Sequence, residues 1–183
     1  MECHQEWESI EIVNERFMKI MKSSEGCAVI MAGSSSDEVY IEKVRKSLSE
    51  YGIPYQIRIC SAHKQPVELM DIIRDYNEVG GLIAYVAIAG GTDALSGILS
   101  FHTYGPVISC PPDKNGLESA LTNPLGSSNA VVSNPKNIGK FIAQIFAGTN
   151  PRLRELLNIN VRKKINELEQ ADSDYSNEFR GEE

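Results

Sequence analysis

The 183-residue chain has no apolar run that approaches the length of a membrane-spanning helix. Its first residues are acidic and mixed, without the apolar core of a signal peptide. Basic residues are also in deficit, because 18 Lys and Arg stand against 25 Asp and Glu and the net charge is −7. A nucleic-acid groove needs clustered positive charge. We therefore expect a cytoplasmic protein that binds neither membrane nor nucleic acid, although a local pocket can still accept a small anionic substrate.

Cysteine pairs with the spacing of a metal or redox site are also missing. Cys3, Cys27, Cys60 and Cys110 lie far apart, and the last three lie in or beside apolar runs. This favours buried free thiols in a reducing compartment. No cluster of His, Cys, Asp and Glu has ligand spacing, and the chain has no Walker loop, G-x-G-x-x-G fingerprint or G-x-S-x-G elbow. The sequence therefore predicts no metal and no cofactor.

What the sequence does contain is an alternation of short apolar runs and amphipathic segments. The runs predict buried strands at 27–32, 55–60, 82–89, 106–109 and 130–133. The amphipathic segments predict helices at 38–51, 66–78, 94–102, 135–146 and 152–169. Strands that alternate with helices form a parallel sheet covered on both faces, so we expect an α/β fold. The most apolar run, 82–89, is expected at the centre of the sheet.

Two extensions flank this core. Ile10, Val13, Phe17 and Met21 recur at helical spacing, so residues 1–26 are expected to form a helical extension that packs on this domain or on a neighbouring subunit. No linker interrupts residues 27–170, which predicts one domain there. Residues 171–183 are polar and predict a frayed tail.

Three polar turns follow three of the predicted strands. They are Gly33–Asp37 (GSSSD), Ser61–Gln65 (SAHKQ) and Gly90–Asp93 (GGTD). The carboxyl ends of parallel strands lie at one edge of a sheet, and ligands bind there where the strand order reverses. We therefore expect the three turns to converge on one site.

The first turn carries groups suited to a phosphate. Ser34 and Ser36 offer hydroxyls, the helix start offers backbone N–H groups, and Gly33 lets the backbone approach a ligand closely. The same pattern suits an ordinary helix cap equally well. Asp37 can cap the helix or accept hydrogen bonds from ribose hydroxyls.

The other two turns carry a proton carrier, a cation and flexible backbone. His63 can move a proton near neutral pH, and Lys64 can neutralise a phosphate, although a lone loop histidine is more often a surface residue. Gly90 and Gly91 suit a tight turn with exposed N–H groups, and Thr92 adds a hydroxyl. A plain turn with a helix cap is the alternative for this last segment.

The order of these segments resembles the PurE family of aminoimidazole ribonucleotide carboxylases and mutases. The matching pieces are IMAGSSSD (30–37), YGIPYQIRICSAHK (51–64), VAIAGGTDALSG (86–97), PVISCPP (106–112) and FIAQIFA (141–147). They span about residues 27 to 150, and their combination is specific. The resemblance implies a flavodoxin-like three-layer α/β/α sandwich with helical extensions, a small-molecule substrate, no cofactor and a homo-octamer.

The family has a branch that rearranges an N5-carboxylated substrate and a branch that uses CO2 directly. Lys64, the SCPP segment at 109–112, and Ala94 in place of the mutase's second histidine make this chain similar to the direct branch. The resemblance implies ATP-independent carboxylation of aminoimidazole ribonucleotide in purine (IMP) synthesis, a carboxy-lyase reaction. The mutase reaction, a divergent enzyme acting on another ribonucleotide and a non-catalytic nucleotide-binding scaffold are the alternatives.

The resemblance also implies residue roles. The expected catalytic residue is His63, and the expected substrate-binding residues are Gly33, Ser34, Ser36, Asp37, Ser61, Ala62, Lys64, Gly90, Gly91 and Thr92. Ser34, Ser61 and Lys64 would hold the 5′-phosphate, and Asp37 would hold the ribose hydroxyls. His63 would exchange the proton at imidazole C4, while the glycine turn would line the CO2 pocket.

Two departures from the direct branch concern the carboxyl group. Gly91, Thr92 and Asp93 stand where that branch has Arg-Ser-Asn, and Thr122 stands where it has a second arginine. Asp93 would repel a carboxylate unless it is protonated or turned away. We therefore expect intact phosphate binding and altered handling of the carboxyl group.

Overall fold

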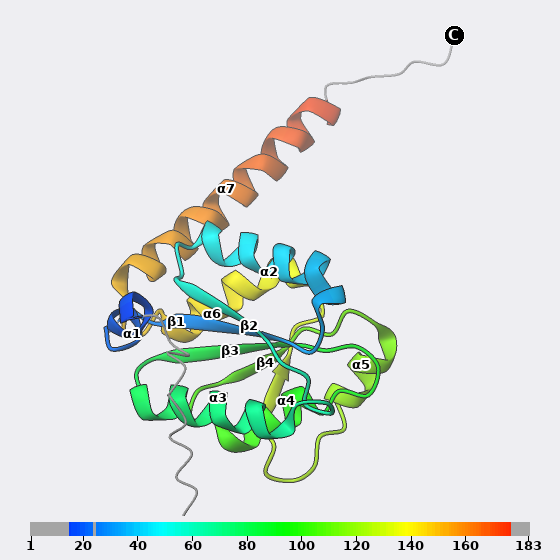
Figure 1. The fold of residues 1–183 in the computed structure, drawn as a ribbon. Helices are drawn as coiled ribbons and strands as arrows, with labels where there is room; N and C mark the ends of the chain where they lie inside the picture. Colours follow the sequence, from blue (N-terminus) through cyan, green and yellow to red (C-terminus); the bar gives the residue numbers. More distant parts are fainter. Residues whose placement is uncertain (1–14, 24, 177–183) are drawn as a thin grey trace, which may run out of the picture.

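The computed structural model describes residues 15–23 and 25–176, and its centre is a five-stranded parallel sheet (Figure 1). The strands are β1 (Cys27–Ala32), β2 (Tyr55–Ile59), β3 (Ile83–Ile88), β4 (Val107–Ser109) and β5 (Asn129–Val131). Their order is β2-β1-β3-β4-β5, and every neighbouring pair is parallel. This is the flavodoxin-like order, in which the direction of winding reverses between β1 and β3.

Helices cover both faces of the sheet, which confirms the predicted three-layer sandwich. One face carries α2 (Glu38–Glu50), α6 (Ile138–Phe146) and the first turns of α7 (Pro151–Ser176). The other face carries α1 (Glu15–Met21), α3 (Pro66–Val79) and α4 (Leu95–His102) (Figure 1). Two 3-10 turns, η1 (Ser35–Asp37) and η2 (Pro135–Asn137), lead into α2 and α6.

The central strands are buried on both faces, as their continuous apolar character predicts. In β1, Cys27, Val29 and Met31 contribute to the core beneath α3 and α4. The alternate residues, including Ala28 and Ile30, contribute to the core beneath α2 and α6. β3 is enclosed in the same way and lies in the middle of the sheet, which confirms the prediction for residues 82–89.

The cysteines of the described chain are free, buried thiols, as the sequence predicts. Cys27 lies in β1, Cys60 follows β2 and Cys110 follows β4. Burial raises the pKa of both Cys27 and Cys110 to about 12, so both remain protonated at neutral pH. These thiols therefore act as small apolar side chains of the core.

One helix was not predicted. α5 (Lys114–Ala120) follows β4 directly after Pro111 and Pro112, where the two prolines indicated only the end of a strand. The Asp113 carboxylate caps this helix, because it accepts a hydrogen bond of 2.7 Å from the Gly116 N–H. The cap allows a helix of seven residues to start immediately after the proline pair.

The two ends of the chain also depart from expectation. α7 continues to Ser176, so the prediction of a frayed tail is wrong for residues 171–176. At the other end, Phe17 and Met21 of α1 are buried in the core of this domain, whereas Ile10 and Val13 lie outside the described residues. No helix in the described ranges is both long enough and apolar enough to cross a membrane.

Replacement of Gly139 by alanine is expected to destabilise the fold. The Gly139 N–H donates a 2.9 Å hydrogen bond to the Ser47 hydroxyl, and a Cβ at residue 139 would collide with the Ser47 carbonyl oxygen of α2. α2 and α6 would have to separate, which costs about 1–3 kcal/mol. Chemical denaturation measures the change. Gly148→Ala is the matched control, because a Cβ there meets no atom within 4 Å; equal stability of the two variants would contradict this reading.

Candidate functional site

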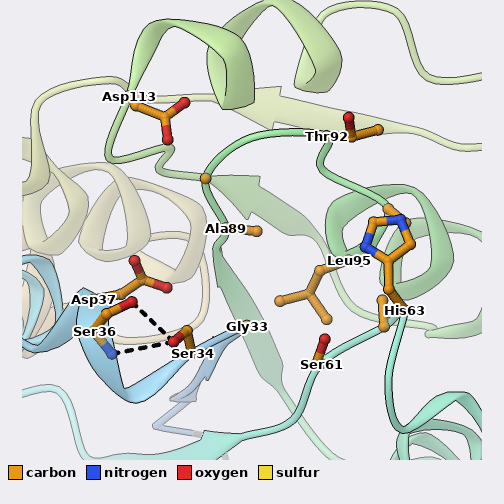
Figure 2. Close-up of a pocket in the computed structure, with 13 residues that line it drawn as sticks. Gly33, Ser34, Ser36, Asp37, Ser61, His63, Ala89, Thr92, Leu95 and Asp113 are labelled. Carbon is orange, nitrogen blue, oxygen red and sulfur yellow. Dashed lines mark hydrogen bonds between the residues drawn. The ribbon is translucent and has the colours of Figure 1, made fainter.

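A polar cavity of about 270 Å³ lies at the carboxyl edge of the sheet, where the strand order reverses (Figure 2). Its walls come from the ends of β1, β2 and β3 and from the segment after β4. The lining residues are Gly33, Ser34, Ser36, Asp37, Ser61, Ala62, His63, Ala89, Gly90, Thr92, Ala94, Leu95 and Asp113. The three turns singled out in the sequence therefore meet in one place.

The first turn is ordered by its own serines. The Ser34 hydroxyl oxygen accepts hydrogen bonds from the Ser36 N–H at 3.2 Å and from the Ser36 hydroxyl at 2.8 Å (Figure 2). Ser34 thus caps η1, so the helix-cap reading holds for this residue. Both serines also line the cavity, so the same oxygens are within reach of a ligand.

Asp37 occupies the cap position of α2 but makes no side-chain cap hydrogen bond there. Burial raises the pKa of its carboxyl group, the backbone N–H of Ser34 lowers it, and the nearby charge of Asp113 raises it further. The net direction is upward from the ordinary value. The carboxylate faces the cavity and can accept hydrogen bonds from a bound ligand.

The second turn is closed by Gln65. Its N–H donates to the Ser61 carbonyl oxygen at 2.8 Å, and its side-chain oxygen accepts from the Ser61 N–H at 3.3 Å. Ser61, Ala62 and His63 line the cavity, and His63 lies across the opening from Asp37 in Figure 2. Lys64 is exposed and does not line the cavity.

In the third turn, Gly90 and Thr92 line the cavity, whereas Gly91 does not. Gly91 has a φ of 65°, a left-handed conformation that glycine adopts without strain. In this conformation the Gly91 N–H donates to both carboxylate oxygens of Asp113, at 3.0 and 3.2 Å. The backbone of this turn is therefore held by a side chain from the segment after β4.

Among the residues that depart from the direct branch, Asp93 and Thr122 are both turned away from the cavity. The Asp93 side chain is only 5% exposed, and it accepts a 3.0 Å hydrogen bond from the Ser96 N–H at the start of α4. Thr122 donates its hydroxyl to the carbonyl oxygens of Glu118 and Ser119, both at 3.1 Å, at the end of α5. Neither residue lines the cavity, so Asp93 does not face a ligand there.

Sequence reasoning missed four lining residues. Ala89, Ala94 and Leu95 form apolar wall beside the polar groups, and Asp113 adds a second carboxylate. Hydrogen bonds from the backbone N–H groups of Gly116 and, to a smaller extent, Gly91 lower the pKa of the Asp113 carboxyl group. Residues 113–116 carry the signature of a helix cap, an Asp followed by a helix-compatible stretch. This signature indicates the start of a helix and gives no sign of the cavity.

The place of the cavity puts the chain among the doubly wound α/β proteins that bind a small molecule beside the strand-order reversal. Within that class, the model of the AIR carboxylase family matches residues 27–167, and the chain belongs to this family. The resemblance to the PurE family is thereby confirmed.

Relatives with assigned names agree with this membership. The chain is 35% identical over 170 residues to the human bifunctional phosphoribosylaminoimidazole carboxylase/phosphoribosylaminoimidazole succinocarboxamide synthetase, covering 90% of this chain and 40% of that protein. It is 34% identical over 165 residues to the phosphoribosylaminoimidazole carboxylase of Archaeoglobus fulgidus, covering 87% and 91%. The crystal structure of Treponema denticola PurE matches with a TM-score of 0.78 at 31% identity, covering 81% and 98%. The chain thus spans about 40% of the length of its bifunctional relatives.

Asp37→Asn is expected to stabilise the fold at pH 7, and this gain should shrink in acid. Because the folded-state pKa of Asp37 is raised, stability falls as the pH rises from the ordinary pKa to the folded-state pKa, and the full cost of ionisation is present above the latter. Below the ordinary aspartate pKa of about 3.9 the carboxyl group is neutral in both states, and the cost disappears. Chemical denaturation of both proteins at neutral and acidic pH measures the difference.

Asp113 supplies the control of opposite sign. Its folded-state pKa is lowered, so its ionised form stabilises the fold above the ordinary pKa, and this contribution is lost as the pH falls through the folded pKa. Asp113→Asn should therefore destabilise the protein at pH 7. An Asp37→Asn protein less stable than the parent at pH 7 would refute the reading of Asp37.

Proposed function

We propose that this chain is a phosphoribosylaminoimidazole carboxylase, which adds CO2 to carbon 4 of aminoimidazole ribonucleotide in purine (IMP) synthesis. The observation that carries the proposal is the convergence of the three turns on one cavity with His63 in its wall. Family membership supports it, as do relatives named for this activity that align over most of their own length, such as the Archaeoglobus fulgidus protein.

The serine-lined end of the cavity suits the 5′-phosphate. Ser34, Ser36 and Ser61 offer hydroxyl donors there, and a phosphate can replace the internal hydrogen bonds between Ser34 and Ser36. Lys64 lies at the outer side of the Ser61–Gln65 turn, where its exposed ammonium group attracts the phosphate through solvent. In this arrangement the hydroxyls orient the phosphate and the lysine adds long-range charge.

Asp37 is placed to hold the ribose. Its carboxylate lies one residue beyond Ser36 and faces the same cavity. A carboxylate accepts hydrogen bonds from two neighbouring hydroxyls, which a ribose presents on one edge. A ribonucleotide anchored at both groups directs its base toward His63 and the Gly90–Thr92 wall.

His63 is the group in this cavity that suits the proton transfer. Carbon 4 of the substrate is electron-rich, because the neighbouring amino group donates into the ring. It attacks the carbon of CO2, a carbon–carbon bond forms, and one C=O electron pair moves to oxygen to give the carboxylate. The proton on carbon 4 then passes to the His63 imidazole, which restores the aromatic ring. The reverse sequence is decarboxylation.

Direct use of CO2 is favoured over the mutase reaction by the lining at residue 94. Ala94 lines the cavity where the mutase branch would carry its second histidine, so no imidazole stands there. Ala89, Leu95 and the Ala94 methyl group instead give an apolar wall. Such a wall suits a neutral, linear molecule such as CO2 better than an additional charged carboxylate.

His63→Asn is expected to abolish carboxylation and to preserve ribonucleotide binding. Removal of the proton acceptor should lower the rate by about 10²- to 10⁴-fold, the usual contribution of a general base. Incorporation of labelled bicarbonate into aminoimidazole ribonucleotide without ATP measures the rate, and calorimetry measures the affinity.

The matched control is His102→Asn, because His102 is an exposed histidine of α4 that does not line the cavity. Absence of turnover in the parent protein at high bicarbonate would refute the carboxylase. Turnover only of the N5-carboxylated substrate with free CO2 scavenged would assign the mutase reaction. Full carboxylation by His63→Asn would refute the catalytic role of His63, whereas ribonucleotide binding by both proteins without turnover of either substrate would favour a non-catalytic scaffold.

Assembly as a cytoplasmic homo-octamer completes the proposal. The outer turns of α7 expose apolar side chains, with Ile165 48% and Leu168 72% exposed, and α7 extends away from the domain in Figure 1. Exposed apolar side chains in a row are typical of a subunit contact. Sedimentation velocity at micromolar concentration should show a species of eight chains that Leu168→Glu weakens. A monomer in the parent protein would contradict the assembly.

A further inference from the structure

Hydrogen bonds join the wall of the cavity to α5 and its cap residue. Two residues of the glycine turn are bound by the two ends of this helix. The Gly91 N–H donates to the Asp113 carboxylate at the start of α5, and the Asp93 N–H donates to the Ser119 hydroxyl at 3.0 Å in its last turn. The Ser119 hydroxyl in turn donates to the Asp93 carbonyl oxygen at 3.2 Å.

α5 also lies directly against this turn. A Cβ on Gly116 would collide with the Ala89 carbonyl oxygen, and a Cβ on Gly90 would collide with the Asp113 carboxylate. These two contacts leave no room for an intervening side chain or water. The first turn of α5 and the wall of the cavity are therefore in direct contact.

The glycine turn has little intrinsic rigidity. Gly90 and Gly91 are consecutive glycines, which lose more conformational freedom on ordering than other residues. Gly91 adopts a positive φ and has no contact on its side-chain face. A hydrogen bond to a charged acceptor is stronger than one between neutral groups, so the Asp113 carboxylate is an effective anchor for such a turn.

We propose that Asp113 is a positioning residue for the reaction at this cavity: its carboxylate fixes the Gly90–Thr92 wall and places a second negative charge in the cavity near Asp37. The role is separate from substrate contact, because Asp113 acts through the backbone of Gly91. The effect of Asp113 on the reaction rests on the proposed carboxylase function. The fixing of the turn by Asp113 does not depend on that function.

The charge of Asp113 has a second effect. The titratable side chains that line the cavity are Asp37, His63 and Asp113, and the Asp113 charge is among the influences that raise the pKa of Asp37. Removal of that charge lowers the pKa of Asp37. Ribonucleotide binding that needs ionised Asp37 then persists to lower pH.

Asp113→Asn tests the role. Asparagine caps helices as well as aspartate does, so α5 keeps its start, while the second oxygen bonded to Gly91 is lost together with the charge. We expect kcat to fall about tenfold with little change in the KM for ribonucleotide, a loss typical of one hydrogen bond to a charged group. We also expect the loss of ribonucleotide affinity in acid to occur at a lower pH in Asp113→Asn than in the parent.

Hydrogen–deuterium exchange provides a readout that needs no turnover. The peptide covering Gly90 to Asp93 should exchange faster in Asp113→Asn than in the parent. Glu118→Gln is the matched control, because it removes one negative charge from the exposed side of α5 without touching the turn. If Asp113→Asn unfolds, Asp113→Ser replaces it, since serine is also a good cap.

The outcomes separate the two claims. Unchanged exchange and unchanged kcat in Asp113→Asn, or equal changes in Glu118→Gln, would overturn the positioning role. Faster exchange in Asp113→Asn than in a parent protein that itself makes no carboxylated product would leave the anchor in place and refute the proposed reaction alone. If Asp113→Asn turns over more slowly but loses ribonucleotide affinity at the same acidic pH as the parent, the proposed effect of the Asp113 charge on Asp37 would be overturned.

Discussion

Burial of β1 and β3 on both faces is the constraint on which the rest of the molecule depends. Each of these strands supplies alternate side chains to two separate cores, so each must be apolar throughout. Parallel pairing then places both carboxyl ends at one edge. Winding proceeds outward from β1 in one direction and from β3 in the other, which leaves the crevice between them open at that edge. Polar turns at this edge share a single cavity.

The chemistry of the cavity depends on which aspartate faces it. Asp93 and Asp113 both accept hydrogen bonds from the first turn of a helix, α4 and α5 respectively. Asp93 is turned into the protein, whereas Asp113 lines the cavity. The two arginines expected at 91 and 122 from the resemblance to the direct branch are absent, yet the Asp93 carboxylate expected to repel a ligand is also turned away from the cavity. The wall at 90–92 thus presents backbone and a hydroxyl to the cavity.

Much of this could be predicted from the sequence, because the relevant signals are local. Continuous apolar runs indicate buried strands, and Gly, Ser and Pro mark the turns that follow them. The meeting of Ser34, Ser61, His63 and Gly90 follows from the parallel sheet. The outward position of Lys64 does not, because it depends on how Gln65 closes the turn after β2. The orientation of Asp93 and the arrival of Asp113 do not either, because they depend on the path of the segment after β4. That path is determined by contacts between residues more than twenty positions apart.

α7 has a consequence of another kind. Its first turns bury Leu153 against the domain, whereas its outer turns carry apolar side chains that remain exposed in the single chain. A helix without packing is only marginally stable in water, because nucleation is costly and each added residue contributes little. The outer turns of α7 are therefore the part of this helix that a covering surface would stabilise most. In the proposed assembly, helical content and protein concentration would be linked quantities, so dilution would unwind this helix before it disturbs the sheet.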